Sequence, residues 1–262
     1  MNEAELVLTH VLDCDRLSLY LKKGAALDKD QSAQVAQIFK RRISGEPLQY
    51  ILGKTEFMGL EFKVDKRALI PRPETEILIE SAIKELKDAD IARPKILDLG
   101  TGSGCIAVSI AKLLPRSIVW AADISEPALK LAVENADQHK VEIKFLRSNI
   151  FSAIQFEKEQ FDLIISNPPY VAVSELNSLA KEISFEPRGA LEAGADGLDF
   201  YREIIDQAAG YLKDNGLLAF EVGINQSKEV KMMLKEENFS NIKIIKDYNN
   251  INRVVIAKKR AK

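Results

Sequence analysis

Cysteine and histidine are scarce in this chain of 262 residues, which contains two of each. Cys14 and Cys105 lie far apart in the sequence, so they provide neither a disulfide framework nor the spacing of a metal site. His10 and His139 lie in separate, charged, helical surroundings and form no cluster of ligands. We therefore expect no bound metal and a reducing compartment.

Long apolar runs and an excess of positive charge are also missing. No segment approaches the roughly 18–20 apolar residues that span a bilayer, and the N-terminus lacks the basic and apolar regions of a signal peptide. The formal net charge of −2 differs from the strong positive charge of most dedicated DNA or RNA binders. We expect a cytoplasmic protein with no membrane partner and no stable nucleic-acid binding.

The first part of the chain, residues 1–53, is predicted to be a small helical module. Apolar residues recur there at helical spacing, behind capping residues at Asn2, at Asp15 and at either Asp28 or Asp30. A module of about 50 residues lies near the lower limit for independent folding. We therefore expect it to lean on the domain that follows.

Residues 54–73 are predicted to form a hairpin and a linker, because apolar residues alternate there around a glycine turn. The prolines of the stretch 69–76 stiffen it, and a helix is expected to begin at Pro73 or Glu74. We interpret this stretch as a rigid linker with an acidic helix N-terminus. The alternative is that it lines an active crevice, with Arg72 and Glu74 facing the substrate.

Residues 74–262 alternate strands and helices, which predicts a doubly wound, mostly parallel sheet of seven strands. A strand at 95–99 is followed by a glycine-rich loop and an apolar helix. The loop comprises Gly100, Thr101, Gly102, Ser103 and Gly104. Its glycines allow backbone to approach a ligand closely, but its spacing is neither that of a dinucleotide fingerprint nor that of a phosphate loop.

The second strand, 118–122, ends at Asp123, whose carboxylate suits the two hydroxyls of a ribose. A ribose site without a phosphate-binding motif indicates an adenosine-containing ligand, and S-adenosyl-L-methionine fits. The third strand, near 143–146, leads to Asn149 and Ile150, which either contact an adenine or form an ordinary turn. Because parallel strands end at the same edge of a sheet, these residues are expected to share one cleft.

The fourth strand, 161–165, leads into Asn167, Pro168, Pro169 and Tyr170. Taken alone, an Asn-Pro pair is more often a strand terminator than a site. The prolines hold Asn167 extended at the strand end. There its side-chain oxygen and the Pro168 carbonyl are expected to project into the crevice at that edge and could accept hydrogen bonds from a ligand.

Five segments together resemble the HemK-type family, the peptide chain release factor glutamine methyltransferases. They occur in the family's order across nearly the whole chain: GEPLQYILG at 45–53, IPRPETE at 70–76, DLGTGSGCIA at 98–107, NPPY at 167–170 and EPRGAL at 186–191. NPPY alone is shared with DNA adenine and ribosomal RNA guanine methyltransferases. The IPRPETE and EPRGAL segments distinguish the release factor glutamine methyltransferases from those other families.

This resemblance implies a class I methyltransferase fold with an antiparallel end strand. It also implies transfer of a methyl group from S-adenosyl-L-methionine to the glutamine of the Gly-Gly-Gln loop of release factors. The helical module would help to hold that protein substrate, and a monomer is expected. The chain departs from the family pattern at Asn149, Phe185 and Asn250.

Two other functions compete with this one. The same pair of acceptors would suit an exocyclic amino group of a DNA or RNA base, with Tyr170 stacked on a flipped base. The acidic charge balance and the lack of a second, basic domain weigh against that. A nucleotide-binding scaffold that recruits a partner would be favoured if the cofactor bound and no methyl acceptor existed.

Overall fold

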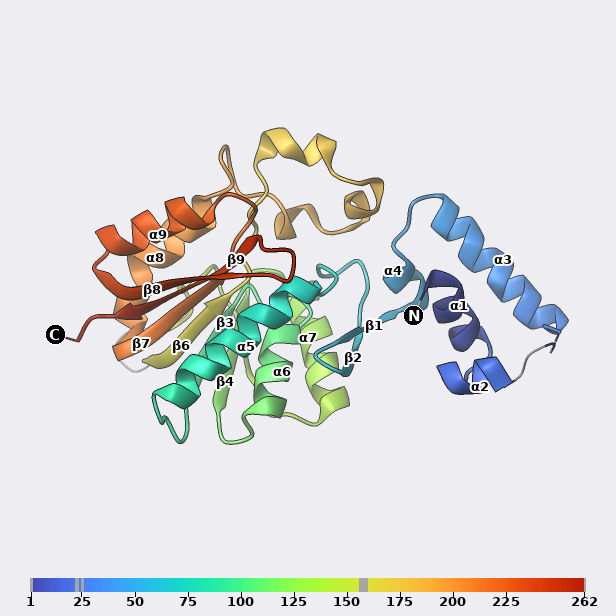
Figure 1. Cartoon of the computed structure of the whole chain (residues 1–262), viewed down its shortest axis with the longest axis horizontal. Helices are drawn as coiled ribbons and strands as arrows, with labels where there is room; N and C mark the ends of the chain where they lie inside the picture. Colours follow the sequence, from blue (N-terminus) through green and yellow to red (C-terminus); the bar gives the residue numbers. More distant parts are fainter. Residues whose placement is uncertain (1, 22–23, 25, 156–159, 262) are drawn as a thin grey trace.

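The computed structural model describes residues 2–21, 24, 26–155 and 160–261. A helical module at the N-terminus lies beside a larger α/β domain, and a small hairpin lies between them (Figure 1). No helix in this described part is both long enough and apolar enough to cross a membrane.

The helical module contains α1 (Glu3–Val11), α2 (Arg16–Leu21), α3 (Lys29–Ile43) and α4 (Leu48–Leu52). The side chain of Asn2 caps α1, and that of Asp28, rather than Asp30, caps α3. Both form capping boxes, in which the residue three positions later reaches back to the cap. The module buries a small core of its own, centred on Val7, Val11, Ile38 and Leu48.

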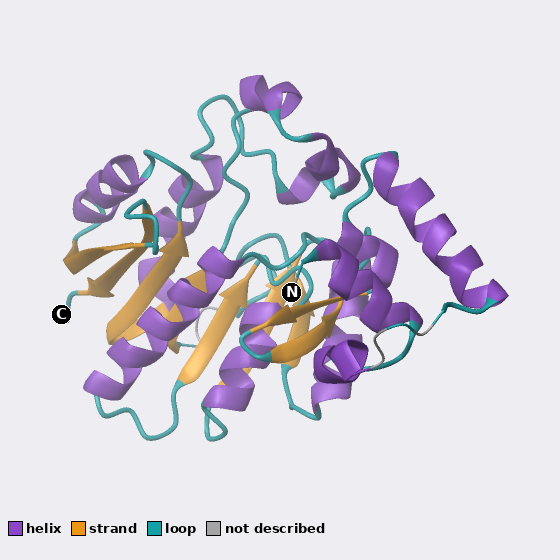
Figure 2. Cartoon of the chain, turned by 45° about the vertical axis from the view of Figure 1, so that its right-hand side comes forward, coloured by secondary structure: helices purple, strands orange, loops and turns teal. Residues whose placement is uncertain are grey.

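The predicted hairpin is present as β1 (Lys54–Phe57) and β2 (Leu60–Lys63), which pair antiparallel around Met58 and Gly59. It begins at Lys54, the first residue of the segment predicted to hold the hairpin and the linker. Phe57 and Phe62 point away from solvent into the core of the α/β domain. The hairpin therefore attaches the helical module to that domain, as Figure 2 shows from the side.

In the described part of the α/β domain, seven strands form one sheet. They are β3 (Lys95–Leu99), β4 (Ile118–Asp123), β5 (Lys144–Arg147), β6 (Phe161–Ser166), β7 (Leu212–Glu221), β8 (Phe239–Lys246) and β9 (Asn252–Lys259). Their order is β5-β4-β3-β6-β7-β9-β8. The antiparallel strand is β9, which lies between β7 and β8 and pairs with both. The predicted mostly parallel sheet is confirmed.

Helices cover both faces of the sheet. On one face lie α5 (Pro73–Asp88), α6 (Cys105–Leu113) and α7 (Glu126–His139), and on the other lie α8 (Asp199–Tyr211) and α9 (Ser227–Glu236). Neighbouring strand residues alternate between the two cores: Ile165 packs with α5 and α6, and Ile164 packs with α8. Because both faces of the sheet are buried, the strands appear in the sequence as continuous apolar runs.

The strand order reverses beside β3, which has β4 on one side and β6 on the other. At such a switch point the loops leaving two neighbouring parallel strands diverge, and a crevice forms between them. The loops after β3 and β6 hold the glycine-rich and NPPY segments. The topology thus brings the two strongest sequence motifs to one edge of the sheet.

The segment 171–191 arches over that edge toward the helical module (Figure 1). It contains three short 3₁₀-helices, Val173–Ser178, Lys181–Phe185 and Arg188–Ala190. Arg42 of α3 pairs with Glu182 in the arch at 2.7 Å and with Glu3 of α1 at 2.9 Å. One guanidinium therefore joins the arch to two helices of the module.

Asn135 of α7 fixes the hairpin to the α/β domain. Its fully buried side chain accepts a hydrogen bond from the Lys63 N–H at 2.8 Å and donates to the carbonyls of Lys63 at 3.0 Å and Ser103 at 2.8 Å. We predict that Asn135→Ala lowers the free energy of unfolding by about 3 kcal/mol, because buried backbone groups lose their partners. Urea denaturation measures this loss.

Gln138→Ala is the matched control, since Gln138 also joins α7 to the hairpin, donating to the Glu61 carbonyl from an exposed position. We expect it to lower stability by less than about 0.5 kcal/mol. Equal losses in the two variants would show that Asn135 does not hold the hairpin.

Candidate active site

A cavity of about 380 Å³ opens at the carboxyl edge of the sheet. The loops after β3, β4, β5 and β6 contribute to its wall, together with the segment before α5 and the end of the arch. Most of the residues predicted from the sequence line it: Arg72, Gly100, Thr101, Gly102, Ser103, Asp123, Asn149, Ile150, Asn167, Pro168 and Pro169. Gly104, Glu74 and Tyr170 lie outside the lining.

The glycine-rich loop is held by its neighbours on both sides. The N–H groups of Gly100 and Thr101 both donate to the Ala122 carbonyl, at 2.8 and 3.0 Å. The Thr101 hydroxyl donates to Asp98 at 2.6 Å. Asp98 is fully buried, which raises the pKa of its carboxyl to about 7, and its Oδ1 has no hydrogen-bond partner among the described residues. Sequence analysis did not single out Asp98, although an acid next to a glycine loop was a usable signal.

Asp123 joins two loops of the cavity wall. Its Oδ2 accepts from the Gly102 N–H at 2.9 Å, and its Oδ1 accepts from the Ser125 N–H at 2.8 Å. Burial raises the pKa of the Asp123 carboxyl, and these backbone donors oppose that shift. The carboxylate therefore fixes the glycine loop while facing the cavity.

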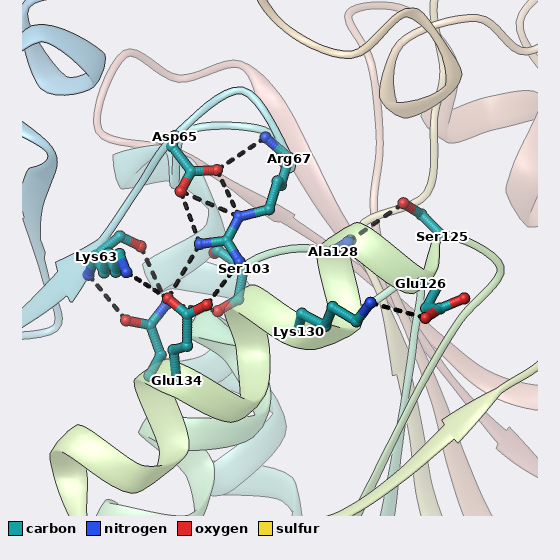
Figure 3. Close-up of polar contacts among 10 residues, drawn as sticks. Lys63, Asp65, Arg67, Ser103, Ser125, Glu126, Ala128, Lys130 and Glu134 are labelled. Atoms are coloured by element: carbon teal, nitrogen blue, oxygen red, sulfur yellow. Dashed lines mark hydrogen bonds and ion pairs between the residues drawn. The ribbon is translucent and has the colours of Figure 1, made fainter.

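A cluster of ion pairs holds Arg67 in the cavity wall (Figure 3). Arg67, which lines the cavity, donates to Asp65 and also to Glu134 of α7 at 2.7 Å, and Lys63 pairs with the same glutamate. Hydrogen bonds from Arg67, and then from Lys63, lower the pKa of Glu134 to about 2. The charge of Arg67 is thus already matched by carboxylates.

The NPPY corner is tied to residues far away in the sequence. The amide Nδ2 of Asn167 donates to the Thr75 hydroxyl at 3.1 Å, and Thr75 donates to Glu221 at 2.5 Å. The Tyr170 hydroxyl donates to the other oxygen of Glu221 at 3.4 Å. Burial raises the pKa of Glu221 to about 7. Thr75 was missed although it lies in the IPRPETE segment, and Glu221 was missed because no local pattern marks it.

The interpretation of residues 69–76 as a linker is wrong. Arg72 pairs with the buried carboxylate of Glu186, which also accepts from the Ile70 N–H at 3.2 Å. This contact joins the two segments that narrowed the family resemblance and sets them against the cavity. The alternative, that the stretch lines a crevice, is the observed arrangement for Pro71, Arg72 and Thr75.

The turn after β5 is unusual at Ile150, a β-branched residue with a φ of 49°. A left-handed backbone is strained for such a side chain. Ile150 and the exposed Asn149 both line the cavity, so this turn contributes to the site rather than only reversing the chain. Ile124, which follows Asp123 and is 62% exposed, adds a second apolar side chain to the same wall.

Comparisons with known proteins agree with this arrangement. Residues 74–253 match the methyltransferase small domain, and residues 1–53 match the PrmC N-terminal domain. The chain is 41% identical over 263 residues to a release factor glutamine methyltransferase of Fusobacterium nucleatum, covering 99% of this chain and 73% of the relative. It is 40% identical over 254 residues to one of Geobacter sulfurreducens, covering 97% and 87%.

A solved structure of a methyltransferase from Pyrococcus furiosus shares the fold. The TM-score is 0.57 at 17% sequence identity, and the likeness covers 89% of this chain and 100% of that one. The class I methyltransferase fold predicted from the sequence is therefore confirmed.

Gly104 provides a test of how tightly the glycine loop is packed. Its φ is 81°, and a Cβ there would lie 2.9 Å from the Cβ of Ala132, whereas a Cβ at Gly100, with a φ of 70°, would meet nothing within 4 Å. Gly100→Ala should cost about 1–2 kcal/mol from the left-handed backbone alone. Gly104→Ala should cost a further 1–3 kcal/mol, roughly, from overpacking. Equal losses in denaturant titrations would contradict close packing against α7.

Proposed function

Because this chain belongs to the family of release factor glutamine methyltransferases, we propose which of its residues bind the two reactants and which drive the transfer. The enzyme transfers a methyl group from S-adenosyl-L-methionine to the side-chain amide nitrogen of a release-factor glutamine. We take that glutamine to be the one in the Gly-Gly-Gln motif, as the resemblance of the sequence implies.

The cavity fits S-adenosyl-L-methionine by its chemistry. Asp123 presents a carboxylate suited to ribose hydroxyls, while Ile124, Ile150 and Asn149 offer apolar surface and one polar group to an adenine. Arg67 and Arg72 are both paired with carboxylates. Among the described residues that line the cavity, no unpaired cation is therefore left to repel a sulfonium. When bound, the cofactor supplies an activated methyl carbon.

The glycine-rich loop would hold the remainder of the cofactor. A Cβ at Gly100 would meet nothing, so the loop leaves its ligand side open. Gly100, Thr101, Gly102 and Ser103 line the cavity directly, and Gly104 supports them by packing on α7. Asn167 lines the same cavity and would border both reactants.

A glutamine amide nitrogen is a poor nucleophile, because its lone pair is delocalised into the carbonyl group. Acceptors aimed at both of its N–H bonds would hold it in line with the methyl carbon and stabilise positive charge that develops during transfer. Asn167 Oδ1 and the Pro168 carbonyl are the proposed acceptors. The Asn167 amide is bound to Thr75 through its Nδ2. Among the described residues nothing donates to its Oδ1, which leaves this oxygen available to the substrate.

The remaining residues would guide the protein substrate to this point. Pro169 lines the cavity beside Asn167, and Tyr170 would flank the entering amide from the corner. Arg72 and Glu74 lie at the entrance to α5 and would contact the substrate loop. Residues 1–53 would hold the release factor, and residues 74–262 would carry out the transfer. Residues 54–73 would connect these two parts, with Pro71 and Arg72 also lining the cavity. The protein would act as a cytoplasmic monomer.

A methylation assay with labelled cofactor separates this function from its competitors. Release factor, tRNA, rRNA and DNA are offered in parallel. We expect label in the release factor alone, and loss of that label when its Gly-Gly-Gln glutamine is replaced. Label in a nucleic acid would favour the base methyltransferase, and cofactor binding with no acceptor would favour the scaffold.

Asn167→Ala should lower turnover by at least about 100-fold, because the main acceptor for the nucleophile is lost. The dissociation constant of S-adenosyl-L-methionine should change by less than about threefold, since the ribose contact remains. Single-turnover methylation and titration calorimetry measure the two quantities. Near-normal turnover would remove Asn167 from the mechanism.

Asp123→Ala should show the opposite pattern. Loss of hydrogen bonds to a charged group, worth about 1.5–3 kcal/mol, should weaken cofactor binding by at least about tenfold. Asp123→Asn keeps the shape of the side chain and one oxygen, which can accept from the Gly102 or the Ser125 N–H group but not from both. Its Tm, compared with that of Asp123→Ala, shows how much of the loss of binding comes from a loosened loop. An unchanged dissociation constant for Asp123→Ala in calorimetry would rule out the ribose contact.

A further inference from the structure

We propose that Glu221 is a positioning residue that acts through Thr75 to set the orientation of the Asn167 amide and that anchors Tyr170 directly. This inference rests on the proposed function, because it concerns the residue that would hold the substrate glutamine. It assigns a role to two side chains that do not touch the reacting atoms in the scheme above.

Glu221 is the last residue of β7 and is 1% exposed. Its Oε2 accepts from the Thr75 hydroxyl at 2.5 Å, and its Oε1 accepts from the Tyr170 hydroxyl at 3.4 Å. The Arg253 guanidinium donates to Asp247 at 3.3 Å and acts on Glu221 only through its charge. Among the described residues, the hydrogen bonds to the Glu221 carboxylate come from the hydroxyls of Thr75 and Tyr170. Both ends of the NPPY corner are therefore connected to one carboxylate.

The direction of the hydrogen bonds follows from the number of protons. An ionised carboxylate can only accept, so Thr75 must use its single hydroxyl proton to donate to Glu221. The Thr75 oxygen can then only accept, and Asn167 must present its NH₂ group to it, as observed at 3.1 Å. Asn167 Oδ1 is consequently left for the substrate.

Without this arrangement the amide of Asn167 has two orientations related by a 180° rotation. In the second orientation its NH₂ group would face the substrate N–H groups, donor against donor. A glutamine nitrogen would then lose one of its two acceptors. The charge on Glu221 thus determines, through the hydroxyl of Thr75, which end of the Asn167 amide faces the substrate.

The cost of burying Glu221 also indicates a functional role. Burial of an unpaired carboxylate is destabilising, and a neutral isostere is often tolerated or stabilising at such positions. Burial raises the pKa of Glu221 from 4.5 to about 7, so the folded state loses stability as pH rises through that range. A residue kept for folding alone would not need this charge.

Thr75→Val is the first test, because it keeps the shape of the side chain and removes the hydroxyl. We expect turnover on the release factor to fall by at least about tenfold, the order expected when a hydrogen bond of the buried network is lost. The release factor KM and the cofactor dissociation constant should stay within about twofold. Thr75→Ser, which restores the hydroxyl, should recover turnover to within about threefold of the wild type.

Glu221→Gln is the second test, because it removes the charge and leaves the shape. The wild-type turnover should fall as pH drops below about 7, where Glu221 takes up a proton, and the variant should lack this dependence. Its Tm at pH 8 should equal or exceed that of the wild type, while its turnover is lower. The other titratable groups that interact with Glu221 are unchanged in this comparison: Glu74, Cys105, Tyr170, Tyr201 and Arg253.

The outcomes distinguish the proposed role of the Glu221–Thr75–Asn167 chain of hydrogen bonds, here called the relay, from the proposed function of the enzyme. Wild-type methylation of the release factor with Thr75→Val and Glu221→Gln both fully active would overturn the relay alone. A Glu221→Gln variant that loses Tm, cofactor binding and turnover together would assign Glu221 to the fold. Absence of release-factor methylation by the wild type would overturn both.

Discussion

Among the described residues, four buried or half-buried carboxylates accept the hydrogen bonds that shape the cavity. Each lies at or near the carboxyl edge of the sheet and accepts from a residue outside the sheet, in a loop or at the start of α5. The pairs are Asp98 with Thr101, Asp123 with Gly102, Glu186 with Ile70, and Glu221 with Thr75. Removing one of these acceptors would leave a buried donor unpaired, so the wall depends on all of them.

These carboxylates also determine which ligand charge the cavity favours. Burial raises the pKa values of Asp98 and Glu221 to about 7, so the folded protein resists their ionisation. A nearby cation stabilises ionised carboxylates and lowers such pKa values. A sulfonium bound in the cavity would provide such a charge, and the lining arginines, which are already paired with carboxylates, would not compete with it.

The sequence predicted the features that depend on local chemistry. The glycine loop, Asp123 and the NPPY corner were all placed correctly at one edge, because strand–loop–helix patterns fix both their conformation and their side of the sheet. Thr75 and Glu221 could not be found in this way, since their contact spans 146 positions. The stretch 69–76 was interpreted wrongly for a related reason: two prolines stiffen a segment equally whether it is exposed or buried, and the partner that buries it, Glu186, lies 114 residues away.

The Tyr50 hydroxyl in α4 of the helical module donates to the Ala68 carbonyl at 2.6 Å, in a fully enclosed position. Ala68 is itself part of the cavity lining. The helical module, which would hold the release factor, is therefore hydrogen-bonded directly to the wall that would enclose the cofactor. A displacement of α4 therefore cannot leave this contact unchanged: it must either move Ala68 or break the hydrogen bond.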